Sequence, residues 1–235
     1  MTPMKLLFFT AALILSSGSV FAQETNPPTG QAKDKAPETA ATQNAVDMPQ
    51  AAVGDHWSYD VFDDITGAVK ESRTWLVTDV SPKDITCRVE LAGSSTTESV
   101  IIYDTYWDIV RDGGIRWSPH NFGGVQLPLE VGKSWTFKAS EIDMKGQVWK
   151  KSGQSRVTGK ETVVTKAGSF DAFVVETKFV RRNGNDASPK SDFTMKTWYS
   201  PVIDHWVKRS TIVSQDGHVV QNDTVELTSY GRRKT

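Results

Sequence analysis

The sequence predicts an all-β fold: an antiparallel β-barrel or strongly curved half-barrel sheet, divisible into two related β subdomains and preceded by a disordered tether. After Val53, Val, Ile, Thr and aromatic residues alternate with polar ones, which is typical of half-buried strands. Strong turn dipeptides interrupt this pattern, and no stretch of eleven or more residues keeps a helical period with caps. A sheet of many strands is expected to close or curve so that its edges are hidden.

Residues 1–22 have the pattern of a cleavable signal peptide, with a Lys, an apolar run from Leu6 to Leu15, and small residues at Val20 and Ala22. No Cys follows the run to take a lipid anchor, so we expect an exported protein that is not a lipoprotein. The periplasm is the expected location, with the extracellular space as the alternative. Residues 23–52 contain four prolines and no aromatic residue, which predicts a disordered linker.

Hairpin turns are predicted where Asp112-Gly113, Asn183-Gly184 and Asp216-Gly217 separate strand-like runs. Longer connections are expected to end at Gly67 and Gly146 with the glycine in a left-handed conformation. The folded part divides into a first β half, 53–130, and a second β half, 131–235, which we expect to pack together as one unit.

Each half opens with the same phrase, "VGDHWSYD" at Val53 and "VGKSWTFK" at Val131. Gly54 and Gly132 would let the chain enter a strand sharply, and Trp57 and Trp135 would begin its buried face. The favoured interpretation is a pair of strand-opening core anchors, since a buried Trp contributes about 3–5 kcal/mol. A ligand-facing aromatic platform is the alternative.

The two halves differ in charge although the whole chain is balanced, with 27 Lys and Arg against 28 Asp and Glu. The first half has six basic and thirteen acidic residues, and the second has eighteen and eleven. Their fields could cancel when the halves pack together. Alternatively, the basic half could make a peripheral contact with anionic lipid headgroups or envelope polysaccharide through Lys150, Lys151, Arg156, Arg181 and Arg182. Nothing in the composition favours nucleic acid.

Several segments of the second half together resemble the DUF3108-like family of bacterial exported (periplasmic) proteins. They are "PLEVGKSWTFK" from Pro128, "GKETVVTKAGSFDAFVVET" from Gly159, "TWYSPVIDHWVKR" from Thr197, and the closing "VELTSY". The resemblance implies an antiparallel barrel or half-barrel in the cell envelope without an established activity. It also implies a tight turn at Ala167, Gly168 and Phe170, and a strand end with a bend at Trp198, Tyr199 and Pro201. "VID" at Val202–Asp204 departs from the family pattern at that bend.

Sequence motifs for catalysis are absent, because the chain has no Gly-x-Ser-x-Gly, His-Glu-x-x-His, phosphate loop or dinucleotide fingerprint. We therefore expect no enzymatic activity, no cofactor and no metal. A metal set of Asp204, His205, Asp216 and His218 is conceivable but not favoured. His56 and His205 each precede a Trp, so strand alternation predicts that both point outward. Cys87, the single cysteine, is predicted to be a small core residue rather than a reactive thiol.

The loop "RWSPHNFGGVQLP" is the most binding-like stretch between strands. A plug that closes one end of the barrel with Trp117 and Phe122 is the favoured alternative. The candidate ligand-binding residues are Trp57, Trp117, His120, Phe122, Trp135, Trp198 and Tyr199, and the candidate structural-motif residues are Gly54, Gly132, Gly168, Phe170 and Pro201.

The expected function is that of a non-catalytic cell-envelope protein that binds an apolar or amphipathic ligand, such as a lipid, in a tryptophan-lined interior. The alternative is a structural or protein-interaction module of the envelope, with a packed interior and no ligand.

Overall fold

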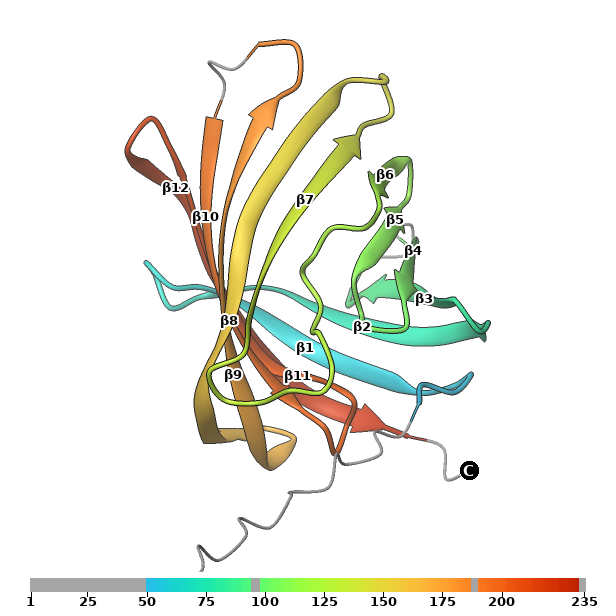
Figure 1. The fold of residues 1–235 in the computed structure, drawn as a ribbon. Helices are drawn as coiled ribbons and strands as arrows, with labels where there is room; N and C mark the ends of the chain where they lie inside the picture. The colour runs from blue at the N-terminus through green and yellow to red at the C-terminus, as the bar shows by residue number, and fades with distance from the viewer. Residues whose placement is uncertain (1–49, 94–97, 187–189, 233–235) are drawn as a thin grey trace, which may run out of the picture. The chain divides into compact units, whose positions relative to one another are not determined.

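The computed structural model of the chain describes residues 50–93, 98–186 and 190–232, and these form an antiparallel β-barrel (Figure 1). Its strands follow the order β1-β12-β11-β10-β9-β8-β7-β6-β5-β4-β3-β2, and β2 pairs with β1 to close the sheet. The all-β prediction is confirmed. The predicted signal peptide and nearly all of the predicted linker lie outside the described residues.

Every strand pairs with its neighbours in sequence, and β12 pairs with β1 as well as with β11. The short strands β5 and β6 interrupt a wall built otherwise of longer strands (Figure 1). The strands are β1 (His56–Asp63), β2 (Val69–Val80), β3 (Asp84–Leu91), β4 (Glu98–Asp104), β5 (Ile109–Asp112), β6 (Ile115–Ser118), β7 (Ser134–Ile142), β8 (Val148–Thr165), β9 (Gly168–Asn183), β10 (Lys190–Ser200), β11 (His205–Gln215) and β12 (His218–Gly231).

The two copies of the Val-Gly-x-x-Trp motif adopt the same backbone conformation, which we call the repeated corner. Gly54 and Gly132 both have φ of 94°, a conformation that side chains disfavour. The N–H of Gly54 donates to the carbonyl of Val77 on β2 at 2.9 Å, and that of Gly132 donates to the carbonyl of Val157 on β8 at 2.8 Å. In return, each valine N–H donates to the residue after the glycine, Asp55 or Lys133. The two copies are therefore matched strand entries into two hairpins.

The predicted turns are present, with one correction. Asp112-Gly113 joins β5 to β6, and Asp216-Gly217 joins β11 to β12 with positive φ at both residues. Gly67 and Gly146 also have positive φ, at 71° and 78°. Asn183-Gly184 is not a two-residue turn, because β10 begins only at Lys190.

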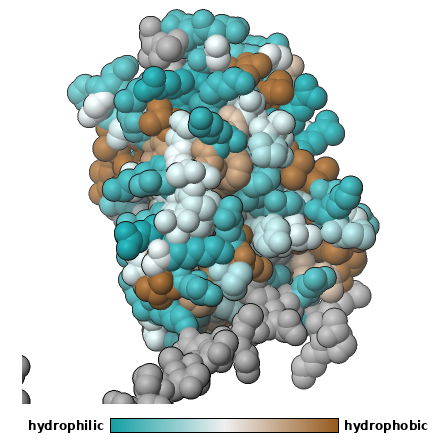
Figure 2. Space-filling model, in the orientation of Figure 1, coloured by the Kyte–Doolittle hydropathy of each residue, from teal (hydrophilic) through white to brown (hydrophobic). Residues whose placement is uncertain are grey.

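The core lies inside the barrel and is rich in aromatic rings. Cys87 is fully buried between Ile85 and Val89 on the inner face of β3, as predicted. The face shown in Figure 2 is mostly hydrophilic, with scattered small apolar groups. Among the described residues, no helix has the length and apolar character needed to cross a membrane.

Candidate functional site

The interior of the barrel is centred on His205, which is fully buried at the start of β11. Its imidazole stacks on the indole of Trp57, with ring centroids 4.5 Å apart, and meets the indole of Trp107 edge-on at 4.6 Å. Burial, followed by the positive charge of Arg209, lowers the pKa of His205 well below its usual value. The imidazole is therefore neutral at physiological pH.

The prediction that His205 points outward is wrong. Trp206 is buried as well, at 5 % exposure, so two successive side chains enter the core. Strand alternation does not hold here because β11 starts directly after a turn, with Asp204 at φ of 52°, and a β-bulge follows Trp198 on the neighbouring strand β10. His56, by contrast, is half-buried.

The metal set considered from the sequence is also excluded. His205 lies at the first residue of β11, whereas Asp216 and His218 flank the turn beyond its last residue, Gln215. A strand rises about 3.3 Å per residue, so the two pairs of side chains are tens of ångströms apart. They cannot share one ion.

Two of the candidate ligand-binding residues are part of the packed core. Trp57 is 0 % exposed and donates from Nε1 to the carbonyl of Ile203 at 3.1 Å. Tyr199 is 1 % exposed and donates to Oδ1 of Asp204 at 2.5 Å. A ligand could reach either ring only if the core opened.

Two other candidates lie apart from this pair and from each other. Trp135 is half-buried on β7 and packs against the edge of the core. Trp198 is half-buried on β10, where Nε1 donates to Oε2 of Glu161 at 2.6 Å and Lys196 lies 4.6 Å from the ring centroid. Gly168, Phe170 and Pro201 lie at strand ends, Gly168 and Phe170 at the start of β9 and Pro201 directly after β10.

Of the remaining three candidates, Trp117 lies on β6, and His120 and Phe122 lie in the connection from β6 to β7. The Phe122 ring stacks on Phe137 with centroids 4.8 Å apart, and His120 lies 4.1 Å from Phe122. Trp117 donates from Nε1 to Oε2 of Glu141 at 3.3 Å. The connection thus covers inward-facing side chains of β7, and the plug at one end of the barrel stays a prediction.

Glu141 is the centre of an ion cluster on the inner face of the barrel. It accepts hydrogen bonds from Nε and Nη2 of Arg181, and Nζ of Lys151 lies 3.5 Å from its Oε2. Burial acts to raise the pKa of Glu141, but the two cations outweigh it and hold that pKa below its usual value. Burial lowers the pKa of Lys151 against the opposing effect of Glu141. Lys151 and Arg181, which the alternative interpretation of the charged halves placed toward an anionic partner, thus face the interior.

A row of three basic residues crosses the outer face of the barrel. Lys150 on β8 is directly opposite Arg182 on β9, and Arg182 is directly opposite Lys190 on β10. Lys190 pairs with Asp192 at 3.2 Å, whereas Lys150 and Arg182 form no ion pair with any described residue. We call Lys150, Arg182 and Lys190 the basic row.

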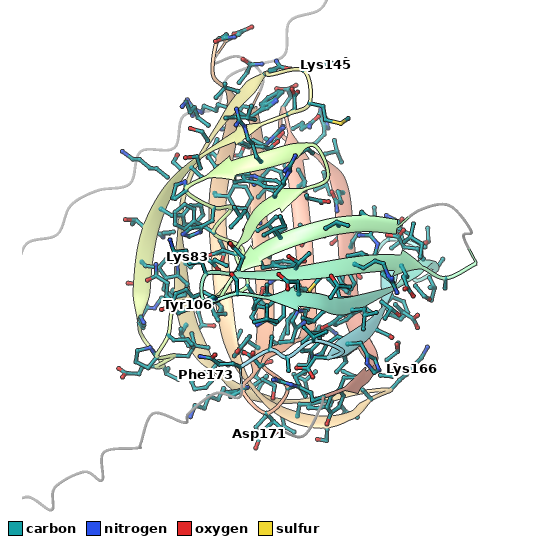
Figure 3. The ribbon with its side chains drawn as sticks, turned by 90° about the vertical axis from the view of Figure 1, so that its right-hand side faces the viewer. Lys83, Tyr106, Lys145, Lys166, Asp171 and Phe173 are labelled. Carbon is teal, nitrogen blue, oxygen red and sulfur yellow. The ribbon has the colours of Figure 1, made fainter. Side chains whose placement is uncertain are left out.

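A shallow groove of about 440 Å³ lies beside the basic row. No Asp or Glu is among the described residues that line it: Ser118, Lys138, Ala139, Ser140, Lys150, Lys151, Ser152, Val180 and Arg182. The row and the groove lie toward the end of the barrel that carries the β7–β8 turn, where Figure 3 labels Lys145. Sequence reasoning identified Lys150 and Arg182 as basic, but only strand register shows that they are neighbours.

Asp104, Asp108 and His120 form a third polar cluster, between the β4–β5 turn and the β6–β7 connection. Nδ1 of His120 lies 3.0 Å from Oδ2 of Asp108, and Nε2 lies 4.0 Å from Oδ2 of Asp104. Sequence reasoning singled out His120 but neither aspartate.

Comparison with known proteins identifies a shared fold. No protein-family model and no curated protein matches the chain. The barrel is similar to a candidate lipoprotein of Parabacteroides distasonis, with a TM-score of 0.51 and 14 % identity over 78 % of this chain and 97 % of that chain. The resemblance to the DUF3108-like family therefore stays a prediction.

Two further solved structures match at lower scores. A candidate exported protein with a YmcC-like fold from Bacteroides fragilis has a TM-score of 0.47 and 11 % identity, over 79 % of this chain and 99 % of that one. The hypothetical lipoprotein YmcC of Escherichia coli has a TM-score of 0.46 and 9 % identity, over 77 % of this chain and 88 % of that one.

Proposed function

We propose that this chain is a non-catalytic, exported cell-envelope protein that docks on anionic lipid headgroups through the basic row and the adjoining groove. The observation that carries the proposal is the direct opposition of Lys150, Arg182 and Lys190 on three adjacent strands. Like charges placed opposite each other across a sheet destabilise it, so the basic row lowers the stability of the folded state. An anionic ligand would remove that repulsion.

The chemistry of the groove fits a phosphate-bearing surface. Lys138, Lys150 and Arg182 supply cationic donors, and Ser140 and Ser152 add hydroxyl groups between them. Arg and Lys are the side chains that most often bind phosphate, and each basic residue near an anionic leaflet contributes about 1 kcal/mol.

Apolar exposure at the same end of the barrel also favours a membrane surface. Met144 in the β7–β8 turn is 81 % exposed, and Lys145 follows it. A side chain of this kind can enter the headgroup region while neighbouring cations bind phosphates. The aromatic rings of the interior pack on one another. An amphipathic lipid would therefore be bound through its headgroup at the outer surface of the barrel and not inside it.

Export and periplasmic location form part of the proposal. Residues 1–22 have the sequence pattern of a signal peptide, and the Parabacteroides protein of the same fold is a candidate lipoprotein. A protein held near an envelope membrane would meet phosphatidylglycerol-type headgroups at high local concentration.

Co-sedimentation with vesicles tests the proposal. The purified chain should bind vesicles rich in phosphatidylglycerol at low ionic strength, bind phosphatidylcholine vesicles far less, and lose binding as salt is raised. The double substitution Lys150→Ala with Arg182→Ala should weaken binding roughly 30-fold, since two contacts of about 1 kcal/mol are lost.

Arg156→Ala is the matched control, because Arg156 is exposed on β8 but is opposite Glu176 rather than another cation. Binding that is equal on both lipids, or that survives the double substitution, would reject the proposal. Binding to an acidic polysaccharide without binding to vesicles would reject the lipid assignment and favour an envelope polymer instead.

A further inference from the structure

The cluster of Asp104, Asp108 and His120 is assembled from two loops that hydrogen bonds hold together. Asn121 donates from its N–H to the carbonyl of Ile109 at 2.9 Å, and its Oδ1 accepts the N–H of Ile109 at 2.7 Å. Val125 donates to the carbonyl of Tyr106 at 3.0 Å. The cluster is therefore built into the folded state rather than carried by loose surface side chains.

Gly124 shows how closely the two loops approach each other. A Cβ at this position would lie 2.2 Å from the carbonyl oxygen of Tyr106 and 2.7 Å from the backbone nitrogen of Asp108, so only glycine fits. The N–H of Gly124 instead donates to Oδ1 of Asp108 at 2.5 Å. This contact fixes one oxygen of that carboxylate.

Backbone hydrogen bonds orient both carboxylates in the same way. Oδ1 of Asp104 accepts the N–H groups of Tyr106 and Asp108, at 2.9 and 3.0 Å. With the Oδ1 atoms of Asp104 and Asp108 occupied, both Oδ2 atoms are left to face the imidazole of His120. Neither Oδ2 atom accepts a backbone N–H from the described residues.

The imidazole of His120 lies between the two carboxylates. Nδ1 of His120 is buried and lies 3.0 Å from Oδ2 of Asp108, and this interaction raises the pKa of His120. Asp108 is only 5 % exposed. A carboxylate and an imidazole held face to face in this way can share either a proton or a metal ion.

We propose that Asp104, Asp108 and His120 bind a divalent transition-metal ion of the zinc or manganese type. The three ligand atoms, one from each residue, lie within 4.8 Å of one another, so small side-chain rotations bring them to the separations of about 3–4 Å that atoms sharing an ion at about 2.0–2.2 Å have. One imidazole with two carboxylates suits zinc and manganese, whereas magnesium and calcium prefer oxygen ligands alone. The Oδ1 hydrogen bonds then orient the carboxylates toward the ion.

Two nearby cationic side chains affect the metal affinity that we expect of this site. The positive charges of Lys151 and Arg209 both act on Asp108 and offset part of the negative charge of the cluster. Three protein ligands with water completing the shell, and cations close by, point to moderate rather than very tight binding. The site is independent of the basic row, so this inference stands apart from lipid binding.

Metal titration of the chelator-treated full chain tests the inference. Zn²⁺ should bind with a stoichiometry of about one by calorimetry, and Co²⁺ in its place should give visible absorption bands that report nitrogen and oxygen ligands. His120→Ala should weaken Zn²⁺ binding by on the order of 100-fold and abolish the Co²⁺ bands. His218→Ala, which removes an exposed histidine at the β11–β12 turn, should change neither.

Asp108→Asn is a second variant that should lose binding, with its fold verified by circular dichroism. If it fails to fold, His120→Ala decides the question, because the His120 side chain is 25 % exposed and its removal leaves the core intact. Unchanged Zn²⁺ affinity in His120→Ala, equal losses in His120→Ala and His218→Ala, or no binding by the unaltered chain at millimolar Zn²⁺ would each overturn the proposal.

Discussion

The indole of Trp57 on β1 and the imidazole of His205 on β11 stack with their planes 16° apart, although β12 lies between these two strands in the sheet. Tyr59, two residues after Trp57, adds a polar link, because its hydroxyl contacts Nδ1 of His205 and donates to the carbonyl of Trp206 at 2.8 Å. The start of β11 is thus fixed against β1 by a ring contact and by hydrogen bonds.

Removing the Tyr59 hydroxyl should destabilise the fold without changing it. Tyr59→Phe leaves the carbonyl of Trp206 and Nδ1 of His205 without their partner, at a cost of about 1–3 kcal/mol in the free energy of unfolding. Urea denaturation measures this difference. Tyr106→Phe is the control, since Tyr106 is 47 % exposed and its hydroxyl has no hydrogen bond to a described residue. Equal effects of the two substitutions would contradict the prediction.

Asp204 should make stability depend on pH. Burial raises its pKa from 3.8 to about 6, so the folded state keeps a proton that the unfolded chain releases. The resulting stabilisation is complete below the unfolded pKa and is lost as pH rises through the folded one. Asp204→Asn removes this dependence, and asparagine tolerates the positive φ at this position.

The measurement is the free energy of unfolding of wild type and Asp204→Asn at several pH values. Relative to wild type, the variant should gain up to about 3 kcal/mol between pH 4 and pH 7. His205 has the opposite sign, because its lowered pKa makes the protein less stable as pH falls, but it is present in both proteins and cancels in the difference. A difference that is constant with pH would show that Asp204 titrates normally.

The two repeated corners should respond alike to the same substitution. Gly54→Ala and Gly132→Ala each force a side chain into φ of 94°, which should cost at least about 1–2 kcal/mol. A Cβ at Gly132 meets nothing within 4 Å, so the cost there is backbone strain and not a clash. Gly159→Ala is the matched control, because it has equal space and no positive φ. Thermal unfolding would reveal any asymmetry between the corners.

Cys87 should be inert in the folded protein. Its side chain is fully buried, and burial raises the pKa of the thiol to about 12, so almost no thiolate forms near neutral pH. A colourimetric thiol reagent should label no cysteine in the native state and the single cysteine in denaturant. Ser152→Cys, at an exposed position on β8, provides a reactive reference. Rapid labelling of native wild type would contradict the prediction.

Local signals in the sequence were sufficient for the fold class and for most turns. The turn at Asp216-Gly217 has positive φ at both residues. Because few other dipeptides accept that geometry, the dipeptide alone predicts the hairpin turn. His205 could not be placed in this way, because its direction depends on the turn before β11 and the bulge on β10. Side chains alternate between the two faces of a strand only where no turn or β-bulge interrupts it.

For the candidate sites, the sequence did not predict which residues that are far apart in the chain become neighbours in the fold. Lys150, Arg182 and Lys190 become a row only through the register of β8, β9 and β10. Asp108 and His120 are twelve positions apart and carry no metal-binding motif, and the hydrogen bonds of Asn121 and Gly124 bring them together. The lysines and arginines of the second half were recognised as a group, but the inward direction of Lys151 and Arg181 was not.

Short pairing on both sides of β6 makes this part of the barrel wall weaker than the rest. β6 pairs with β7 over Arg116–Ser118 and with β5 at only two positions, whereas β8 and β9 pair along almost their full lengths. Short pairing leaves few hydrogen bonds to break, so this seam should open before the global fold does. Amide hydrogens of β5 and β6 would then exchange with solvent ahead of those of β8 and β9. Because the opening would expose the inner ion cluster around Glu141, water should reach the barrel interior first along this line.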